Sequence, residues 1–271
     1  MNFKKLLTLS VLISLISLPL LAQSGKITIA GSTTVLPIAQ ATAEIFMDSH
    51  PEINISVRGG GSSVGIASII AGTADIGDAS RHISTKEIAQ ARENGINPYE
   101  NIVANDGIAI ILNKNNPIND LSLSQLQSIY TGKIQNWKEL GGPSLPIVLI
   151  SRDVSSGTFE VFNSIVLSGA KAAESALMLA SNNAVATTVK DTPGAIGYAG
   201  LGYVTDAIKA IKVNGVMPAK QTIQSKEYPI SRTLHMYTNG APKGIVKTYI
   251  DFILSPEGQA LVEEQGFISV D

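Results

Sequence analysis

The chain contains no cysteine, which excludes disulfide bridges, thiolate metal sites and catalytic thiols. Histidine is scarce as well: 3 copies are scattered along 271 residues, and no spacing typical of a metal site joins them. Only 15% of the residues are charged and Lys and Arg form no run, which argues against a nucleic-acid partner. The glycine motifs of nucleotide-binding proteins are also missing. We therefore expect neither a cofactor nor a bound metal.

The one long apolar run lies at the N-terminus and has the layout of a signal peptide. Lys4 and Lys5 precede an apolar stretch over residues 6–21, and Ala22 is a small residue suited to the cut. This stretch is too short, and too soon followed by polar residues, for a good membrane anchor. We expect residues 1–22 to be removed, which takes the formal charge from −2 to −4. Without a cysteine for lipid attachment, the exported chain should be free in the periplasm.

After this segment, three stretches share one design: a short apolar strand, a loop of Gly, Ser and Thr, and the start of an amphipathic helix. The strands are 26–30, 54–57 and 147–150, and the loops that follow them are 31–34, 59–63 and 151–158. Pro37 suits the first turn of the helix after the first loop. This order of elements predicts an α/β architecture.

Two further strands are predicted at the centre of the fold. Gly107–Leu112 is almost wholly apolar, and Thr233–Tyr237 is similar, so each is suited to carry the chain between two lobes. His235 lies within the second of these strands and is expected to be a core residue. Ser255 and Pro256 predict the cap and the first position of a last helix.

The three loops are suited to hold an anion. A helix N-terminus presents free backbone N–H groups and a partial positive charge, and glycine lets the backbone approach an anion closely. Arg152 adds a guanidinium that binds two oxygens at once, and Ser156, Gly157 and Thr158 follow it at a helix start. Ser and Thr are also ordinary helix caps, so each loop has a purely structural interpretation beside the anion-binding one.

Several segments together resemble one protein family. They are Gly31–Pro37, Gly59–Gly65, Ala74–Gly77, Asn105–Ala109, Ser151–Phe159, Thr192–Tyr198 and Ser255–Gln259. In this order they resemble the phosphate-binding proteins of bacterial phosphate ABC transporters (the PstS type), in the shorter branch of that family. The resemblance implies a type II periplasmic-binding-protein fold, with two α/β lobes joined by a two-stranded hinge. By our division, residues 23–106 plus 233–271 form one lobe and residues 107–232 the other.

The resemblance also implies a function and a set of ligands. Inorganic phosphate would be clamped between the lobes and delivered to membrane permease subunits by a monomeric, non-enzymatic receptor. The matching positions are Ser32, Thr33, the backbone N–H of Thr34, Ser62, Arg152, Ser156, Gly157 and Thr158.

The sequence departs from the family at one ligand. Where the longer branch has an aspartate that accepts the proton of monohydrogen phosphate, this chain has Ser80, followed by Arg81. We expect Asp106 to supply the missing acceptor, with Asp78 as a second candidate, because sulfate lacks that proton and a carboxylate repels it. Arg81 is expected to form a structural ion pair.

Two rival functions remain open at this point. The first is the same fold holding another oxyanion, such as sulfate or molybdate. The second is a serine hydrolase, because Gly61–Gly65 fits the Gly-x-Ser-x-Gly pattern with Ser63 as nucleophile. That pattern is short and common in loops of this composition.

Overall fold

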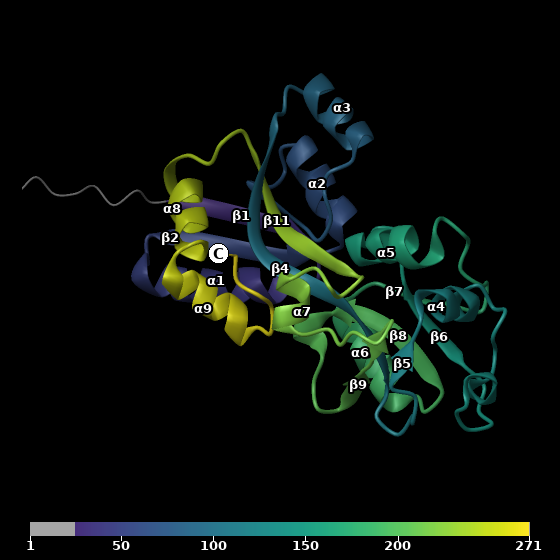
Figure 1. The fold of residues 1–271 in the computed structure, drawn as a ribbon. Coiled ribbons are helices and arrows are strands. Elements are labelled where there is room, and N and C mark those ends of the chain that lie inside the picture. Colours follow the sequence, from purple (N-terminus) through teal and green to yellow (C-terminus); the bar gives the residue numbers. More distant parts are fainter. Residues whose placement is uncertain (1–24, 271) are drawn as a thin grey trace, which may run out of the picture.

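The computed structural model describes residues 25–270, so the expected signal peptide lies outside the described part. One mixed sheet runs through the molecule in the strand order β2-β1-β3-β11-β4-β8-β6-β7, with β9 paired to β4. Helices cover the sheet, and the strands separate into two α/β lobes (Figure 1). Among the described residues, no helix has the length and apolar character needed to cross a membrane.

The first lobe is drawn mainly on the left of Figure 1 and holds both the beginning and the end of the described chain. Its three strands β1, β2 and β3 are parallel. Its elements are β1 (Gly25–Gly31), α1 (Leu36–Ser49), β2 (Ile53–Gly59), α2 (Ser62–Ile70), β3 (Ile76–Ala79), α3 (Thr85–Glu93), α8 (Gly244–Ile253) and α9 (Pro256–Glu264). One apolar cluster, including Ile29, Phe46 and Tyr249, lies between the sheet and helices α1, α8 and α9. A smaller cluster under α2 and α3 fills the opposite face.

The second lobe is built around β6 and β8, which are parallel. Its elements are β5 (Asp120–Leu121), α4 (Leu123–Tyr130), η1 (Trp137–Leu140), β6 (Val148–Arg152), α5 (Gly157–Phe162), η2 (Asn163–Leu167), β7 (Leu177–Leu179), α6 (Asn182–Asp191), β8 (Ala195–Gly200), η3 (Leu201–Tyr203), β9 (Ile208–Ala210), β10 (Lys212–Val213) and α7 (Lys220–Gln224). Its core combines aliphatic side chains with several aromatic rings: Phe162 stacks on Tyr198 at 3.9 Å, and Trp137 is fully buried.

Two long antiparallel strands join the lobes, as predicted. They are β4 (Pro98–Asn113) and β11 (Ser231–Asn239), which are paired along the whole length of β11. β4 pairs with β11 as far as Gly107 and with β8 from Ile108 onward. Because β4 changes its pairing partner within one continuous strand, the chain passes from one lobe into the other without a loop. Two α/β lobes joined by two hinge strands in this way form the type II periplasmic-binding-protein fold.

The three predicted strand–loop–helix units are present and are arranged alike. β1 leads to α1, β2 to α2 and β6 to α5. The last helix also begins as predicted, since Ser255 Oγ accepts a hydrogen bond of 3.2 Å from the N–H of Gly258 and Pro256 is the first helical residue. His235 is fully buried in β11, in agreement with its prediction as a core residue.

Candidate anion-binding site

The loops of the three units meet where the two lobes touch. Ser63 N, at the start of α2, donates a hydrogen bond of 3.1 Å to the carbonyl oxygen of Ser155, just before α5. Ser155 Oγ in turn donates to Gly60 O at 3.2 Å. Thr34 Oγ1 and Thr158 Oγ1 lie 3.1 Å apart, one from each lobe. Segments more than 90 residues apart in the chain thus converge on one buried polar region.

Arg152 lies at the end of β6 and is 1% exposed. Its Nε donates to Leu179 O at 3.0 Å, and its Nη2 donates to Ala180 O at 3.0 Å and to Thr33 Oγ1 at 3.2 Å. These partners are all neutral, and Nη1 has no hydrogen-bond partner among the described residues. Burial lowers the pKa of this guanidinium to about 10. A buried cation with an unused donor is unfavourable unless a negative charge lies close to it.

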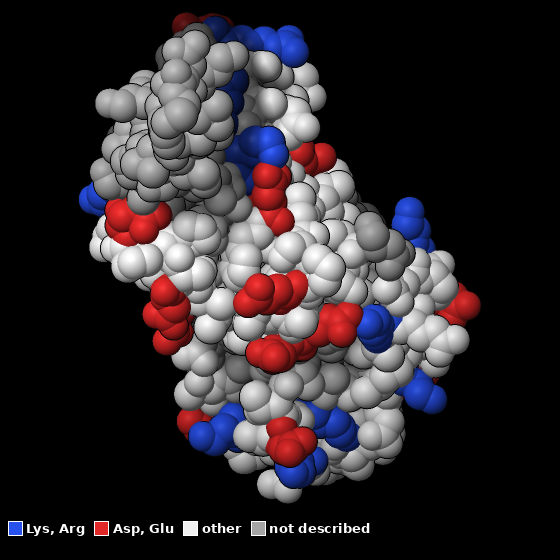
Figure 2. All heavy atoms as spheres, turned by 90° about the vertical axis from the view of Figure 1, so that its left-hand side faces the viewer, with Lys and Arg blue, Asp and Glu red and all other residues white. Residues whose placement is uncertain are grey.

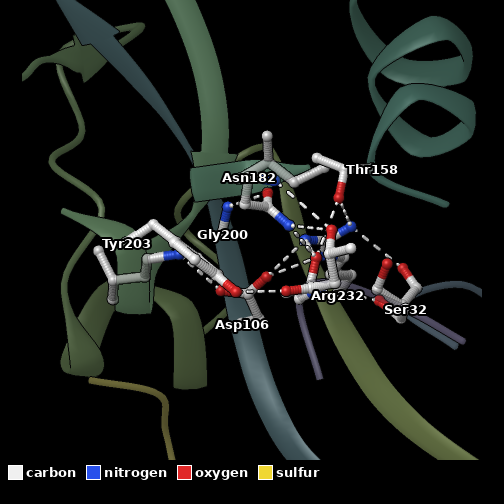
Figure 3. A network of polar contacts seen from close by, with 12 residues as sticks. Ser32, Asp106, Thr158, Asn182, Gly200, Tyr203 and Arg232 are labelled. Atoms are coloured by element: carbon white, nitrogen blue, oxygen red, sulfur yellow. Dashed lines mark hydrogen bonds and ion pairs between the residues drawn. The ribbon is translucent and has the colours of Figure 1, made fainter. Parts of the chain in front are cut away.

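Asn182, at the start of α6, connects the lobes through its amide group (Figure 3). Its Nδ2 donates to Thr33 Oγ1 at 3.1 Å and to Thr34 Oγ1 at 3.0 Å, while its Oδ1 accepts from Gly200 N at 3.2 Å. The hydroxyl of Tyr203 donates to the carbonyl oxygen of Thr33. Asn182 and Tyr203 carry no signal in the sequence, because neither lies in one of the three loops.

Arg232 is a second buried guanidinium in this region, and it too carries no signal in the sequence. It lies near the start of β11 and is 4% exposed. Its Nη1 donates to Thr158 Oγ1 at 3.0 Å, and its Nη2 donates to Thr34 Oγ1 at 3.3 Å. Figure 3 shows Arg232 between Thr158 and Asp106. The hydroxyls of Thr34 and Thr158 are therefore shared between the two lobes and the hinge.

Asp106 is fully buried in β4 and faces Arg232. Its Oδ2 lies 2.9 Å from Arg232 Nε and 2.8 Å from Nη2, and its Oδ1 accepts from Leu201 N at 2.9 Å. Burial raises the pKa of Asp106, and the Arg232 guanidinium partly offsets this effect. Burial likewise lowers the pKa of Arg232, with Asp106 acting in the opposite sense. Asp106 therefore pairs with Arg232, whereas no carboxylate in the described part of the chain accepts a hydrogen bond from Arg152.

Ser62 and Ser80 form a hydroxyl pair beside the start of α5. Ser80 N donates to Ser62 Oγ at 2.9 Å, and the two Oγ atoms are 3.3 Å apart. A Cβ atom built on Gly157 would lie 2.3 Å from Ser62 Oγ and 2.9 Å from Ser80 Oγ. Only glycine therefore permits this approach of the two lobes.

One of the predicted site residues caps a helix with its side chain, and others do not. Ser156 caps α5, since its Oγ accepts from Phe159 N at 3.2 Å. The residues before α1 and α2 make no side-chain cap, so Thr33, Thr34 and Ser62 do not act as caps. Ser32 Oγ accepts from Thr34 N at 3.1 Å within the first loop. The threonine hydroxyls are consequently available to the polar region between the lobes.

Ser63 and Arg81 belong to a neighbouring charged cluster. Arg81 forms the predicted ion pair, with Nη2 lying 2.8 Å from Glu87 Oε1. Ser63 Oγ accepts from Arg81 Nη2 at 3.1 Å and donates to Glu160 Oε1 at 3.2 Å. No hydrogen bond of the described residues joins Ser63 to a histidine, so the nucleophile–base pair of a serine hydrolase is not formed here.

A family model described as a PBP superfamily domain matches residues 21–257. A PstS phosphate-binding protein of Bacillus subtilis is 38% identical over 249 residues, which are 91% of this chain and 81% of that protein. The chain belongs to the PstS family. A second PstS, from Borreliella burgdorferi, is 33% identical, with 90% of each chain aligned.

Solved structures agree with this assignment to the PstS family. A putative phosphate ABC transporter substrate-binding protein from Clostridium perfringens, solved with bound phosphate, is 37% identical with a TM-score of 0.84. The alignment covers 91% of this chain and all of that one. An ABC-type phosphate transport receptor from Vibrio cholerae is 32% identical with a TM-score of 0.74, and 90% of this chain and all of that one are covered.

Proposed function

We propose that this chain is a receptor that binds inorganic phosphate between its lobes and leaves it chemically unchanged. The observation that carries the proposal is the buried Arg152, which has neutral partners and an unused donor at Nη1. A phosphate oxygen near Nη1 supplies the missing acceptor and the missing charge together. The PstS relatives, and the Clostridium perfringens protein with phosphate bound, support phosphate as the anion.

The proposed site combines positive charge with neutral donors. Arg152 and Arg232 provide the charge, and a set of hydroxyls and N–H groups saturates the remaining oxygens, so that a dianion is held without a metal. The proposed ligand region comprises Ser32, Thr33, Thr34, Ser62, Ser80, Asp106, Arg152, Ser156, Gly157, Thr158 and Arg232.

Binding is proposed to close the two lobes on the hinge strands β4 and β11. The lobes would be residues 23–106 plus 233–271 and residues 107–232, a division supported by the partner exchange of β4 after Gly107. The hydrogen bonds from Ser63 to Ser155 and from Arg152 to Thr33 belong to the closed arrangement. Closure of this kind excludes water from the anion and strengthens each contact to it.

The receptor is proposed to be an exported, monomeric protein of the periplasm that delivers phosphate to the permease subunits of an ABC transporter. The names of the Clostridium perfringens and Vibrio cholerae structures support the transport role. One face of the molecule, seen in Figure 2, carries acidic and basic side chains interspersed, without a continuous basic patch. This charge distribution offers no support for nucleic-acid binding through that face.

The decisive experiment is titration calorimetry of the mature chain with phosphate, arsenate, sulfate and molybdate. We expect a phosphate Kd of about 1 μM or lower, equivalent to roughly 8 kcal/mol or more. Arsenate should compete, because its shape and protonation are similar. The melting temperature should rise with phosphate concentration, and the radius of gyration should fall as the lobes close. Equal affinities for sulfate and phosphate would favour a receptor for another oxyanion, and no binding of any anion would refute the proposal.

A further inference from the structure

A cluster of three metal-ligating side chains lies outside the anion site, at the hinge strands. His82 lies between β3 and α3, Glu100 lies in β4, and His235 lies in β11. One ligand atom from each lies within 4.8 Å of the other two. No sequence spacing reveals this cluster, because pairing of distant strands brings the three residues together.

The distances in the cluster fit a single small ion. Glu100 Oε1 lies 2.9 Å from His82 Nδ1 and 3.1 Å from His235 Nδ1. In a tetrahedral zinc site with bonds of about 2.0–2.1 Å, neighbouring ligand atoms are about 3.3 Å apart. Small side-chain movements therefore suffice to place the three atoms around one ion.

His235 Nδ1 is an unpartnered polar atom in a fully buried side chain. It is near Glu100 Oε1, but the geometry is not that of a hydrogen bond. The other ring nitrogen, Nε2, lies 3.0 Å from Thr233 Oγ1. With its proton on Nε2, donated to Thr233, the neutral ring keeps a lone pair on Nδ1, which lies close to a carboxylate oxygen. Two acceptors this close to each other are stabilised by a cation that binds both.

The surroundings of the cluster resemble the outer shell of a metal site. Tyr237 OH donates to Glu100 Oε1 at 2.6 Å and accepts from Ile83 N at 3.0 Å, so it fixes the carboxylate. Hydrogen bonds of this kind hold and orient metal ligands. His82 is 71% exposed, and it lines, with His235, a groove of about 470 Å³. The cluster thus has both a rigid buried side and access from solvent.

We propose that His82, Glu100 and His235 bind one Zn²⁺ ion, or a similar first-row transition metal ion. Water completes the coordination from the groove. Two imidazoles and one carboxylate form a ligand set that suits zinc, and three protein ligands leave one position open. All three ligands come from elements of the first lobe or from the hinge strands that extend it, and none of them belongs to the proposed phosphate ligands. Metal binding is therefore independent of the proposed function.

The test is equilibrium dialysis of the mature chain against zinc chloride in phosphate-free buffer, followed by metal analysis. We expect one Zn²⁺ per chain, and Co²⁺ in its place should give the visible absorption of a four-coordinate ion. The variant His82→Ala should lose the metal, and Tyr237→Phe should weaken its binding by about 10-fold or more. His50→Ala is the matched control and should retain full binding, because His50 lies at the end of α1, stacked on Phe46.

Phosphate titration of the same preparations separates loss of the metal site from loss of the fold. His82→Ala should bind phosphate as the unmodified chain does. Retention of one zinc ion by His82→Ala, or no zinc in the unmodified chain, would overturn the proposal. Loss of zinc from His50→Ala as strong as that from His82→Ala would also overturn it, since the ion would then be held elsewhere.

Discussion

Arg81 of the first lobe and Glu160 of the second form an ion pair between the lobes, with Arg81 Nε 2.8 Å from Glu160 Oε2. The two Nη atoms of Arg81 bind Glu87 in the same lobe, so the guanidinium is fixed before the lobes meet. Glu160 is 38% exposed, which limits the strength of the pair. We propose that this pair favours the closed form of the two lobes.

Glu160→Gln should weaken this ion pair. An exposed ion pair contributes roughly 0.2–1 kcal/mol, so the phosphate Kd should rise by no more than about 5-fold. The dissociation rate, measured by stopped-flow, should carry most of the change. Glu174→Gln, at an exposed acid of the same lobe, is the control and should leave both quantities unchanged. A Kd insensitive to Glu160→Gln would show that the pair has no part in closure.

Arg152→Ala should remove the charged contact proposed for the anion. We expect a loss of roughly 2–5 kcal/mol in binding, because the anion is left partly unpaired. Arg152→Lys should recover only part of the loss, since one ammonium group cannot hold Leu179 O and Ala180 O and reach the anion with the planar geometry of a guanidinium. Calorimetry on both variants measures the effect. Unchanged phosphate affinity in Arg152→Ala would place the site elsewhere.

Asp106→Asn tests how phosphate is distinguished from sulfate. An ionised carboxylate only accepts hydrogen bonds and repels a fully ionised oxygen, whereas an amide also donates. We expect Asp106→Asn to weaken phosphate and to improve sulfate. Because Asp106 also pairs with Arg232, Asp106→Asn alters that ion pair as well as the contact with the anion. The variant is therefore compared with Ser80→Ala. If the ratio of phosphate affinity to sulfate affinity changes only in Ser80→Ala, the Ser80 hydroxyl distinguishes the two anions. Asp106 is then only a structural part of the hinge.

Gly157→Ala should hinder closure without damaging either lobe. The added Cβ would lie 2.3 Å from Ser62 Oγ, an atom of the other lobe. Overpacking of this kind costs about 1–3 kcal/mol, so the phosphate Kd should rise by about 5- to 150-fold. The melting temperature without phosphate should stay close to that of the unmodified chain. A large drop in that temperature would mean that the glycine is needed within its own lobe.

The Arg81–Glu87 pair predicts a pH dependence of stability. Burial alone would raise the pKa of Glu87, but hydrogen bonds from Arg81 and Ser84 lower it below its ordinary value of 4.5. A lowered pKa means that the unfolded state binds the proton more readily, so the contribution is full above pH 4.5 and is lost as the pH falls through the folded pKa. Urea unfolding of Glu87→Gln and the unmodified chain should differ at pH 6 and converge in acid. A constant difference would contradict the linkage.

The sequence predicted those parts of the site that depend on local patterns. Gly31–Thr34 and the loop around Arg152 were recognisable because a strand, small residues and a helix follow one another in each unit. Arg232 escaped detection because it is a single basic residue at a strand start. Its position opposite Asp106 depends on the pairing of β11 with β4, between residues 126 apart in the chain.

Asn182 escaped detection for a similar reason. It follows an ordinary helix cap, Ser181, and only the packing of α6 against β6 and β8 brings its amide to Thr33 and Thr34. Tertiary pairing, which no local pattern encodes, decides each of these cases.

The position of β11 within the sheet also constrains the order of folding. This strand lies between β3 and β4, so the strands β2, β1 and β3 are not joined to β4 until residues 231–239 have been synthesised. The strands of the second lobe, by contrast, all precede β11 in the chain. During synthesis the second lobe can therefore assemble much of its structure early, while the edge of β3 waits for β11, about 150 residues further along the chain. Such distant pairing slows folding, so the first lobe should be the last part of the molecule to become resistant to proteases.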